Sequence, residues 1–183
     1  NPDDVTSLRL IDKDSGEVFT FETTDELSNF KYQRYLKRYL RTIASIDEGV
    51  GYLLDYLDEN QLLENTLVIY TSDQGFFLGE HGWFDKRFIY EQSLQMPFLV
   101  RYPNEIAPGE TCESICCNVD FAPTFLDLAS LKIPSYMQGN SLLPLFKGSE
   151  PDNWPQITYH RYWMHRDPDH NAYAHYGIRT QDY

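Results

Sequence analysis

Three things are scarce in this 183-residue chain: long apolar runs, basic residues and cysteine motifs. No apolar run approaches the length of about 20 residues that a membrane-spanning helix needs, so we expect no transmembrane segment. Lys and Arg number 15 against 28 acidic residues, and the net charge of −13 argues against binding nucleic acid by neutralising phosphates. With 42% hydrophobic and 15% aromatic residues, the chain can still bury a substantial core.

The cysteines and the first residues exclude further kinds of site and segment. Cys112, Cys116 and Cys117 are odd in number, and no second, distant pair is present to complete a structural zinc site. We therefore expect buried or unreactive thiols. The opening residues NPDD form no signal peptide and include no initiating Met, so the chain is expected to be a processed or excised piece.

Hydrophobic periodicity predicts a long helix over residues 29–60. Apolar residues recur every three or four positions from Phe30 to Leu57, and this stripe is expected to be buried. Gly49 and Gly51 interrupt the pattern, so either the helix bends there or another backbone passes close. Ahead of this helix, residues 8–21 predict a β-hairpin.

The middle of the chain predicts an α/β sheet. Residues 66–71 form a short apolar run without alternation, as in a parallel strand covered on both faces, and residues 96–103 predict a second buried strand. Residues 120–130 predict a helix with Asp120 as its N-cap. Residues 131–155 read as a loop-rich connector, followed by two antiparallel strands over 156–163 and 174–180.

The segment 71–86 concentrates chemically capable side chains directly after the first of these strands. In α/β sheets such positions carry functional residues. The Asp73 carboxylate and the Gln74 amide oxygen suit a hard cation such as Ca²⁺ or Mg²⁺. Lys86 adds positive charge for an anionic group, and His81 is able to donate a proton. A polar surface loop is an equally open interpretation of the same residues.

Several motifs in this region together resemble the sulfatase family, and most closely its carbohydrate members of the N-acetylglucosamine-6 type. The matching motifs are YTSDQG (70–75), LGEHG (78–82), Lys86, YE (90–91) and MPFLVRYP (96–103). The resemblance implies part of an alkaline-phosphatase-like α/β fold, a mixed sheet flanked by helices. It assigns residues 1–130 to the C-terminal part of the core, 131–155 to the connector and 156–183 to the start of a small β-rich C-terminal subdomain.

The resemblance also implies roles for individual residues. Asp73 and Gln74 match a pair that holds one divalent cation, usually Ca²⁺, and Lys86 matches a lysine that contacts a sulfate oxygen. His81 is assigned to the neighbourhood of the active site. Three residues of the last two strands are candidates for sugar or sulfate contacts, although packing or exposure to solvent explains them equally well: His160, His175 and Arg179.

One element of the family is absent. Sulfatases attack sulfur with a formylglycine hydrate, made in a Cys/Ser-x-Pro/Ala-x-Arg motif that this sequence lacks. The resemblance thus implies the C-terminal part of a sulfatase, cut at both ends and inactive alone. Its expected partners are the missing N-terminal part and a sulfated sugar or glycosaminoglycan, and the family habit is export to the periplasm, lysosome or extracellular space. Two alternatives stay open: a phosphodiesterase or phosphonate hydrolase of the same superfamily, and a catalytically dead glycan-binding module.

Overall fold

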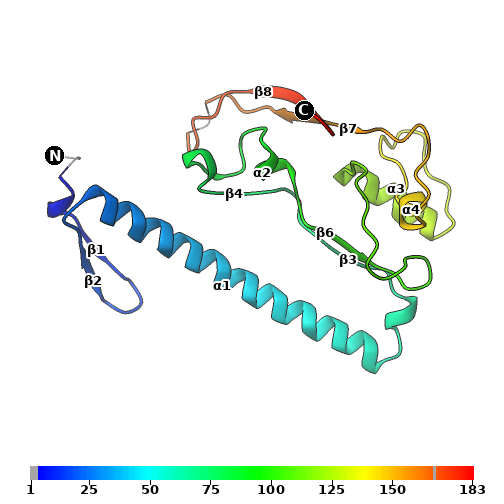
Figure 1. Ribbon diagram of the computed structural model, residues 1–183, viewed down its shortest axis with the longest axis horizontal. Coiled ribbons are helices and arrows are strands. Elements are labelled where there is room, and N and C mark those ends of the chain that lie inside the picture. Colours follow the sequence, from blue (N-terminus) through cyan, green and yellow to red (C-terminus); the bar gives the residue numbers. More distant parts are fainter. Residues whose placement is uncertain (1–3, 167) are drawn as a thin grey trace. The chain divides into compact units, whose positions relative to one another are not determined.

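The structure is a computed structural model that describes residues 4–166 and 168–183. The chain divides into two compact units, Asn1–Asn60 and Gln61–Tyr183 (Figure 1). Within the described residues, no helix combines the length and the apolar character that crossing a bilayer requires.

Unit 1 begins with a short β-hairpin, which confirms the hairpin predicted from the sequence. Its elements are the 3-10 helix η1 (Val5–Ser7) and the antiparallel strands β1 (Arg9–Ile11) and β2 (Val18–Thr20). In the turn between the strands, the Asp12 carboxylate accepts the backbone N–H groups of Asp14 and Ser15 at 2.9 and 3.0 Å. The bond from Ser15, together with the neighbouring Arg34 guanidinium, holds the pKa of Asp12 well below its usual range.

The long helix α1 (Thr24–Glu59) begins five residues earlier than the periodicity predicted. Thr23 starts it, because its side-chain oxygen accepts the N–H of Glu26 at 3.2 Å and so satisfies one of the free donors of the first turn. The hairpin packs on this end of the helix, where the Phe30 ring lies 4.6 Å from that of Phe19 and 5.2 Å from that of Phe21. Local capping and aromatic contacts therefore fix the entry into α1.

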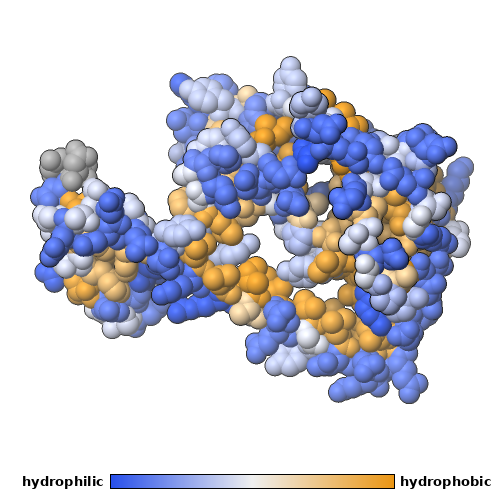
Figure 2. Space-filling model, in the orientation of Figure 1, coloured by the Kyte–Doolittle hydropathy of each residue, from blue (hydrophilic) through white to orange (hydrophobic). Residues whose placement is uncertain are grey.

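The apolar stripe of α1 is not buried, contrary to the prediction. Leu57 is the one buried residue among the described residues of the helix, whereas Leu40 and Leu53 are 59% and 52% exposed. Hydrophobic side chains are open on the visible face in Figure 2. The helix also runs unbroken through Gly49 and Gly51, and a Cβ at either position would have no atom within 4 Å, so no close backbone explains them. The pattern predicted the amphipathic face correctly, but no described residue of unit 1 covers it.

Unit 2 contains the two predicted central strands, but they pair antiparallel. β3 (Val68–Thr71) lies against β6 (Phe98–Arg101) with Ile69 opposite Val100. The strands are half-buried because this sheet has two strands in the described residues, and Leu99 remains 67% exposed. The prediction of a parallel strand covered on both faces is therefore wrong. A continuous apolar run indicates a strand and not the direction of its partner.

Short elements fill the rest of unit 2. Before β6 these are η2 (Leu63–Asn65), β4 (Phe77–Leu78), η3 (Glu80–Gly82), β5 (Phe84–Asp85) and α2 (Glu91–Leu94), and after it η4 (Asn118–Asp120), α3 (Phe121–Leu128), α4 (Leu143–Phe146), β7 (Ile157–Tyr162) and β8 (His175–Thr180). β7 and β8 form the antiparallel pair that the sequence predicted. The predicted helix at 120–130 is confirmed as α3, although Asp120 makes no side-chain cap to it.

The core of unit 2 draws heavily on the segment 131–155. Leu142, Leu145 and Trp154 are buried together, and Phe98 of β6 packs against them. The indole N–H of Trp154 donates to the Ile115 carbonyl at 2.9 Å, so even its polar atom is satisfied. Proline and glycine give this segment the appearance of a connector, yet it supplies all three buried residues of this cluster.

All three cysteines are free thiols, whereas their odd number alone required that at least one be unpaired within the chain. The Cys117 thiol donates to the Thr158 hydroxyl at 3.0 Å, which ties the 112–117 loop to β7. Burial is the main cause that raises the pKa of Cys116 to about 12, so this thiol is unreactive at neutral pH. Cys112 is exposed.

Candidate active site

The residues Asp73 and Gln74 lie in a turn that follows the end of β3. Asp73 is exposed, and its Oδ1 accepts the Ser72 hydroxyl at 3.3 Å. The next residue, Gly75, is buried and donates its backbone N–H to the Ser93 carbonyl of α2 at 2.9 Å. A Cβ at Gly75 would lie 2.2 Å from the Gln92 carbonyl oxygen, so glycine is required by close packing. The turn is thus pinned against α2 just after the two candidate ligands.

A second contact holds the same turn at Asp73. The side-chain amide of Asn118, in η4, donates to the Asp73 carbonyl at 2.9 Å. η4 is itself fixed by the buried Asp120, whose carboxylate accepts the N–H of Cys117 at 2.7 Å and that of Asn140 at 2.8 Å. Sequence reasoning missed Asn118, because no local pattern relates it to a turn 45 residues earlier.

The donor chemistry of Asp73 and Gln74 fits a hard cation, but as a partial set. A Ca²⁺ ion takes six to eight oxygen ligands. In the part of the chain that the structure describes, no group of three or more His, Cys, Asp or Glu side chains is placed to hold an ion. Backbone carbonyls, water or residues outside this chain would have to complete the shell.

His81 lies in a tight glycine-rich turn. Gly79 and His81 have φ values of 119° and 57°, which places both in the left-handed region. The imidazole packs among aromatic rings, 4.8 Å from the Tyr90 ring and 5.8 Å from the Trp83 ring. The Glu80 carboxylate accepts hydrogen bonds from its own N–H and that of Leu78, which lower its pKa. His81 is therefore held in place by tilted contacts with aromatic rings and by a strained turn.

Lys86 belongs to a charged cluster built around Asp85. Its ammonium lies 3.7 Å from one carboxylate oxygen of Asp85, while Arg87 and His170 approach the other at 3.4 and 2.8 Å. Asp85 itself has a φ of 75°, so a strained backbone turns its side chain into this cluster. Sequence reasoning found Lys86 and missed the other three. Of these three, Arg87 is the one whose place next to Lys86 in the sequence could have indicated a charged cluster.

His160 and His175 come together on one face of the β7–β8 pair. Their rings stack with centroids 5.6 Å apart, and the His175 ring lies 6.0 Å from that of Phe88. Among the described residues, the buried Nε2 atom of each imidazole has no hydrogen-bond partner. Burial, followed by the neighbouring His175, lowers the pKa of His160 and favours its neutral form. These two buried nitrogens are therefore not satisfied by any described residue.

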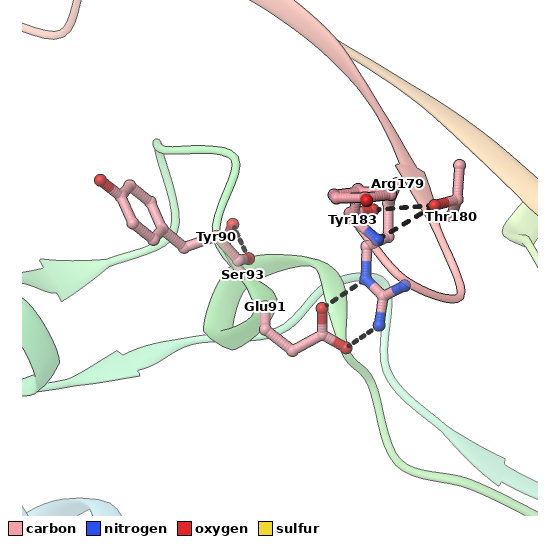
Figure 3. Close-up of polar contacts among 6 residues, drawn as sticks. All are labelled: Tyr90, Glu91, Ser93, Arg179, Thr180 and Tyr183. Carbon is pink, nitrogen blue, oxygen red and sulfur yellow. Dashed lines mark hydrogen bonds and ion pairs between the residues drawn. The ribbon is translucent and has the colours of Figure 1, made fainter.

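Arg179 shares this face of β8 and is anchored to α2. Its guanidinium Nε donates to the Glu91 carboxylate at 2.8 Å, and Nη2 makes a longer contact of 3.4 Å (Figure 3). The hydrogen bond to Glu91 raises the pKa of Arg179. Its third nitrogen, Nη1, is buried with no hydrogen-bond partner in the described part of the chain.

The short helix α2 thus joins the two halves of the candidate site. Ser93 accepts the N–H of Gly75 on one side, and Glu91 holds Arg179 on the other. The Ser93 hydroxyl also donates to the Tyr90 carbonyl at 3.1 Å, which closes the first turn of the helix (Figure 3). The candidate oxygen ligands Asp73 and Gln74, the candidate lysine and the Arg–His face all lie within unit 2.

Comparison with known families identifies the class of protein. Residues 79–183, more than half of the chain, match the family described as N-sulphoglucosamine sulphohydrolase, C-terminal. The chain therefore belongs to this sulfatase family, which confirms the resemblance found in its motifs.

Among curated proteins, the chain is similar to the N-acetylglucosamine-6-O-sulfatase of Bacteroides thetaiotaomicron, with 50% identity over 159 residues. The match covers 86% of this chain and 28% of that protein. The N-acetylglucosamine-6-sulfatase of Homo sapiens is 35% identical over 133 residues, which are 72% of this chain and 24% of that protein. The chain spans roughly a quarter of the length of these relatives.

Solved structures agree on the fold. One, determined in complex with its substrate D-glucosamine-2-N,6-O-disulfate, has a TM-score of 0.82 at 50% identity and covers 85% of this chain and 32% of its own. Sulfatases are among the similar structures, so the small sheets and helices of this chain are part of an alkaline-phosphatase-like fold, as predicted. A phosphonate monoester hydrolase from Silicibacter pomeroyi also matches, with a TM-score of 0.60 at 30% identity, over 63% of this chain and 23% of that one.

Proposed function

We propose that this chain is the C-terminal part of a sulfatase that hydrolyses sulfate esters of sulfated sugars or glycosaminoglycans. The observation that carries the proposal is the pinning of the Asp73–Gln74 turn to α2, the helix whose Glu91 also holds Arg179 beside the two histidines. Membership of the sulfatase family supports the reaction, and the relatives named for N-acetylglucosamine 6-sulfate support the substrate class.

In this proposal Asp73 and Gln74 supply two oxygen ligands to one Ca²⁺ ion. The carboxylate contributes charge, while the amide contributes an oxygen without adding further negative charge. When bound, the ion would stabilise charge on the sulfate oxygens. The chain's own contribution is to hold the two side chains in a turn that is fixed at Asp73 by Asn118 and at Gly75 by Ser93.

Lys86 and His81 are proposed to act on the sulfate group. The Lys86 ammonium places a positive charge beside the Asp85 cluster, where it would attract a sulfate oxygen. His81 would donate a proton to the leaving oxygen from its fixed position among the aromatic rings. The carboxylate of Asp85 keeps Lys86 and Arg87 from repelling one another while the site is empty of substrate.

His160, His175 and Arg179 are proposed to contact the sugar or a second anionic group. Each has a buried nitrogen without a hydrogen-bond partner among the described residues, and such atoms are costly unless a ligand or water satisfies them. The substrate of the similar solved structure carries two sulfates, and a second sulfate of this kind is an anion that an arginine and two imidazoles would recognise.

The chain alone is proposed to be inactive and to act together with a preceding part of the same protein. The formylglycine motif is not in its sequence. The exposed leucines of α1 and a cavity of about 780 Å³ beside the core of unit 2, lined by Phe98, Phe121 and Leu142, are apolar surfaces that further chain would cover. The relatives are also about four times as long as the matched region.

The test is turnover of a 6-O-sulfated glucosamine by the whole sulfatase, the 183-residue chain and three variants. We expect no turnover by the chain alone, loss of Ca²⁺-dependent turnover in Asp73→Ala, and a fall of about 100-fold or more in Lys86→Ala. Asp55→Ala, which removes a carboxylate on α1, is the matched control and should leave turnover unchanged. Unchanged kinetics in both Asp73→Ala and Lys86→Ala would remove the site assignment, and robust turnover by the chain alone would contradict its proposed incompleteness.

The second candidate function is phosphonate or phosphodiester hydrolysis, favoured by the similarity to the phosphonate monoester hydrolase. The same assay distinguishes it, because such an enzyme would prefer a phosphonate monoester over the sulfated sugar. Binding of the sulfated sugar without turnover of either substrate by the whole protein would instead indicate a glycan-binding module.

A further inference from the structure

The turn that carries Asp73 and Gln74 is held at two points by elements distant in sequence. At its end, the Gly75 N–H donates to the Ser93 carbonyl at 2.9 Å. At its start, the Asn118 side-chain amide donates to the Asp73 carbonyl at the same distance. The peptide groups before and after Gln74 are therefore each held by a hydrogen bond, and Asn118 forms the one that lies between the two candidate ligands.

The bond from Asn118 has a particular geometric consequence. The Asp73 carbonyl belongs to the peptide group that joins Asp73 to Gln74, and a peptide group is planar. Holding this carbonyl limits rotation of the peptide group, and the orientation of that group is one of the determinants, with ψ of Asp73 and φ of Gln74, of the directions in which the two side chains point. The hydrogen bond at Gly75 acts instead on the next peptide group, which adjoins Gln74 but not Asp73.

Asn118 is well placed to hold that plane because η4 is anchored in the core. Asp120, 6% exposed, uses both carboxylate oxygens to accept backbone N–H groups, one from Cys117 and one from Asn140. Gly139 approaches so closely that a Cβ there would lie 2.0 Å from the Val119 carbonyl oxygen. The backbone on both sides of Asn118 is thus fixed independently of the turn that it contacts.

We propose that Asn118 is the positioning residue of the ion-binding turn: its amide holds the Asp73–Gln74 peptide plane so that both oxygen ligands face one cation. The inference rests on the proposed function, in which this pair binds Ca²⁺. It predicts that removing the amide weakens binding of the ion far more than it weakens the fold.

The chain offers a matched control in Asn104. Its side-chain amide donates to the Glu64 carbonyl at 3.0 Å, so it makes the same kind of exposed link between distant segments. Glu64 lies in η2, ahead of β3, and no candidate ligand adjoins that carbonyl. Loss of either amide removes one hydrogen bond to a backbone oxygen. The bond from Asn118 adjoins the candidate ligands Asp73 and Gln74, whereas the bond from Asn104 adjoins no candidate ligand.

The experiment is titration calorimetry of Ca²⁺ into the metal-free whole sulfatase, with Asn118→Leu, Asn118→Asp and Asn104→Leu. We expect the Kd of Asn118→Leu to rise about five- to tenfold, the effect of one hydrogen bond, and that of Asn104→Leu to stay at the wild-type value. Unfolding midpoints measured in chelator should fall by similar amounts in the two leucine variants. Asn118→Asp keeps the shape of the side chain, removes the N–H donor and adds a negative charge. If Asn118 positions the turn, this variant should bind Ca²⁺ more weakly, whereas the added charge alone would make it bind Ca²⁺ more tightly.

Each outcome decides the matter. A wild-type Kd in Asn118→Leu, or tighter binding in Asn118→Asp, overturns the positioning role while leaving the ion site intact. An equal rise in Kd in Asn104→Leu overturns it as well, because the effect would then follow general loosening. If the wild-type protein binds no Ca²⁺, the ion site and the positioning role both fail.

Discussion

Gly75 offers the sharpest test of how the candidate site is packed. In Gly75→Ala, the new Cβ would lie 2.2 Å from the Gln92 carbonyl oxygen and 2.6 Å from that of Gln95, whereas real Cβ contacts do not fall below 3.0 Å. The backbone of α2 would have to retreat by the difference, about 0.8 Å at Gln92. Because the obstacle is backbone carbonyls, no side-chain rotation relieves it.

The expected cost follows from two separate effects. Forcing a methyl group into a packed region costs about 1–3 kcal/mol. Retreat of α2 also stretches the hydrogen bond from the Gly75 N–H to the Ser93 carbonyl, and an unpaired buried N–H costs about 1–3 kcal/mol. We therefore expect Gly75→Ala to lower the free energy of unfolding of unit 2 by about 2–6 kcal/mol.

Two other glycines make the measurement decisive. Gly148 has a φ of 66° with open space around it, so Gly148→Ala should cost about 1–2 kcal/mol from backbone strain alone. Gly49 lies inside α1 with nothing nearby, and Gly49→Ala should stabilise that helix by about 1 kcal/mol.

The assay is chemical denaturation followed by two probes. All three tryptophans lie in unit 2, so their fluorescence reports on Gly75 and Gly148, while far-ultraviolet circular dichroism reports mainly on α1 and Gly49. The reasoning is refuted if Gly75→Ala costs no more than Gly148→Ala, because the turn would then not be packed against α2 as described.

Two further predictions concern the same unit. The buried Thr124 hydroxyl donates to the Asp120 carbonyl and accepts the Leu142 N–H at 2.9 Å. Thr124→Val, which removes both bonds, should therefore lower the free energy of unfolding by about 1–3 kcal/mol, and Thr124→Ser, which keeps both, by about 1 kcal/mol. A larger loss in the serine variant, measured by chemical denaturation, would contradict these hydrogen bonds. Burial and the neighbouring His175 lower the pKa of His160 below its ordinary 6.5. As the pH drops through about 6.5, this imidazole is therefore protonated in the unfolded chain before it is protonated in the folded one, and the free energy of unfolding should fall. His160→Asn should flatten that part of the pH profile, and an unchanged slope would rule out this histidine as its source.

Much of the local structure was predictable because it depends on neighbouring residues. The β1–β2 hairpin follows a turn in which Asp12 accepts two nearby N–H groups, and α1 follows its 3.6-residue period and its Thr23 cap. The β7–β8 pair was predicted for the same reason. The predicted domain boundaries at 130 and 155 stay a prediction, although Leu142 and Trp154 show that the intervening segment is core rather than spacer.

The parts that failed depend on contacts between distant residues. The apolar run of β3 indicated a strand, but its antiparallel register with β6 is set by the segment that returns through β4, β5 and α2. The stripe of α1 predicted an amphipathic helix, but a periodic pattern does not say what covers it. Asp85, Arg87 and His170 escaped notice because the first two meet the third 83 residues or more along the chain.

The candidate site depends both on local sequence motifs and on contacts between distant residues, and the two meet at α2. A helix of four residues has no stability of its own, since helix formation must first overcome the cost of its nucleus. Contacts to other segments must hold it, chiefly the Gly75 N–H on the Ser93 carbonyl and the Arg179 guanidinium on Glu91. The same contacts place the Asp73–Gln74 turn and the His160–His175 face. The helix α2 is therefore stabilised by the two parts of the candidate site that it connects. Motifs can therefore name the residues of this site, while their arrangement depends on the folded unit as a whole.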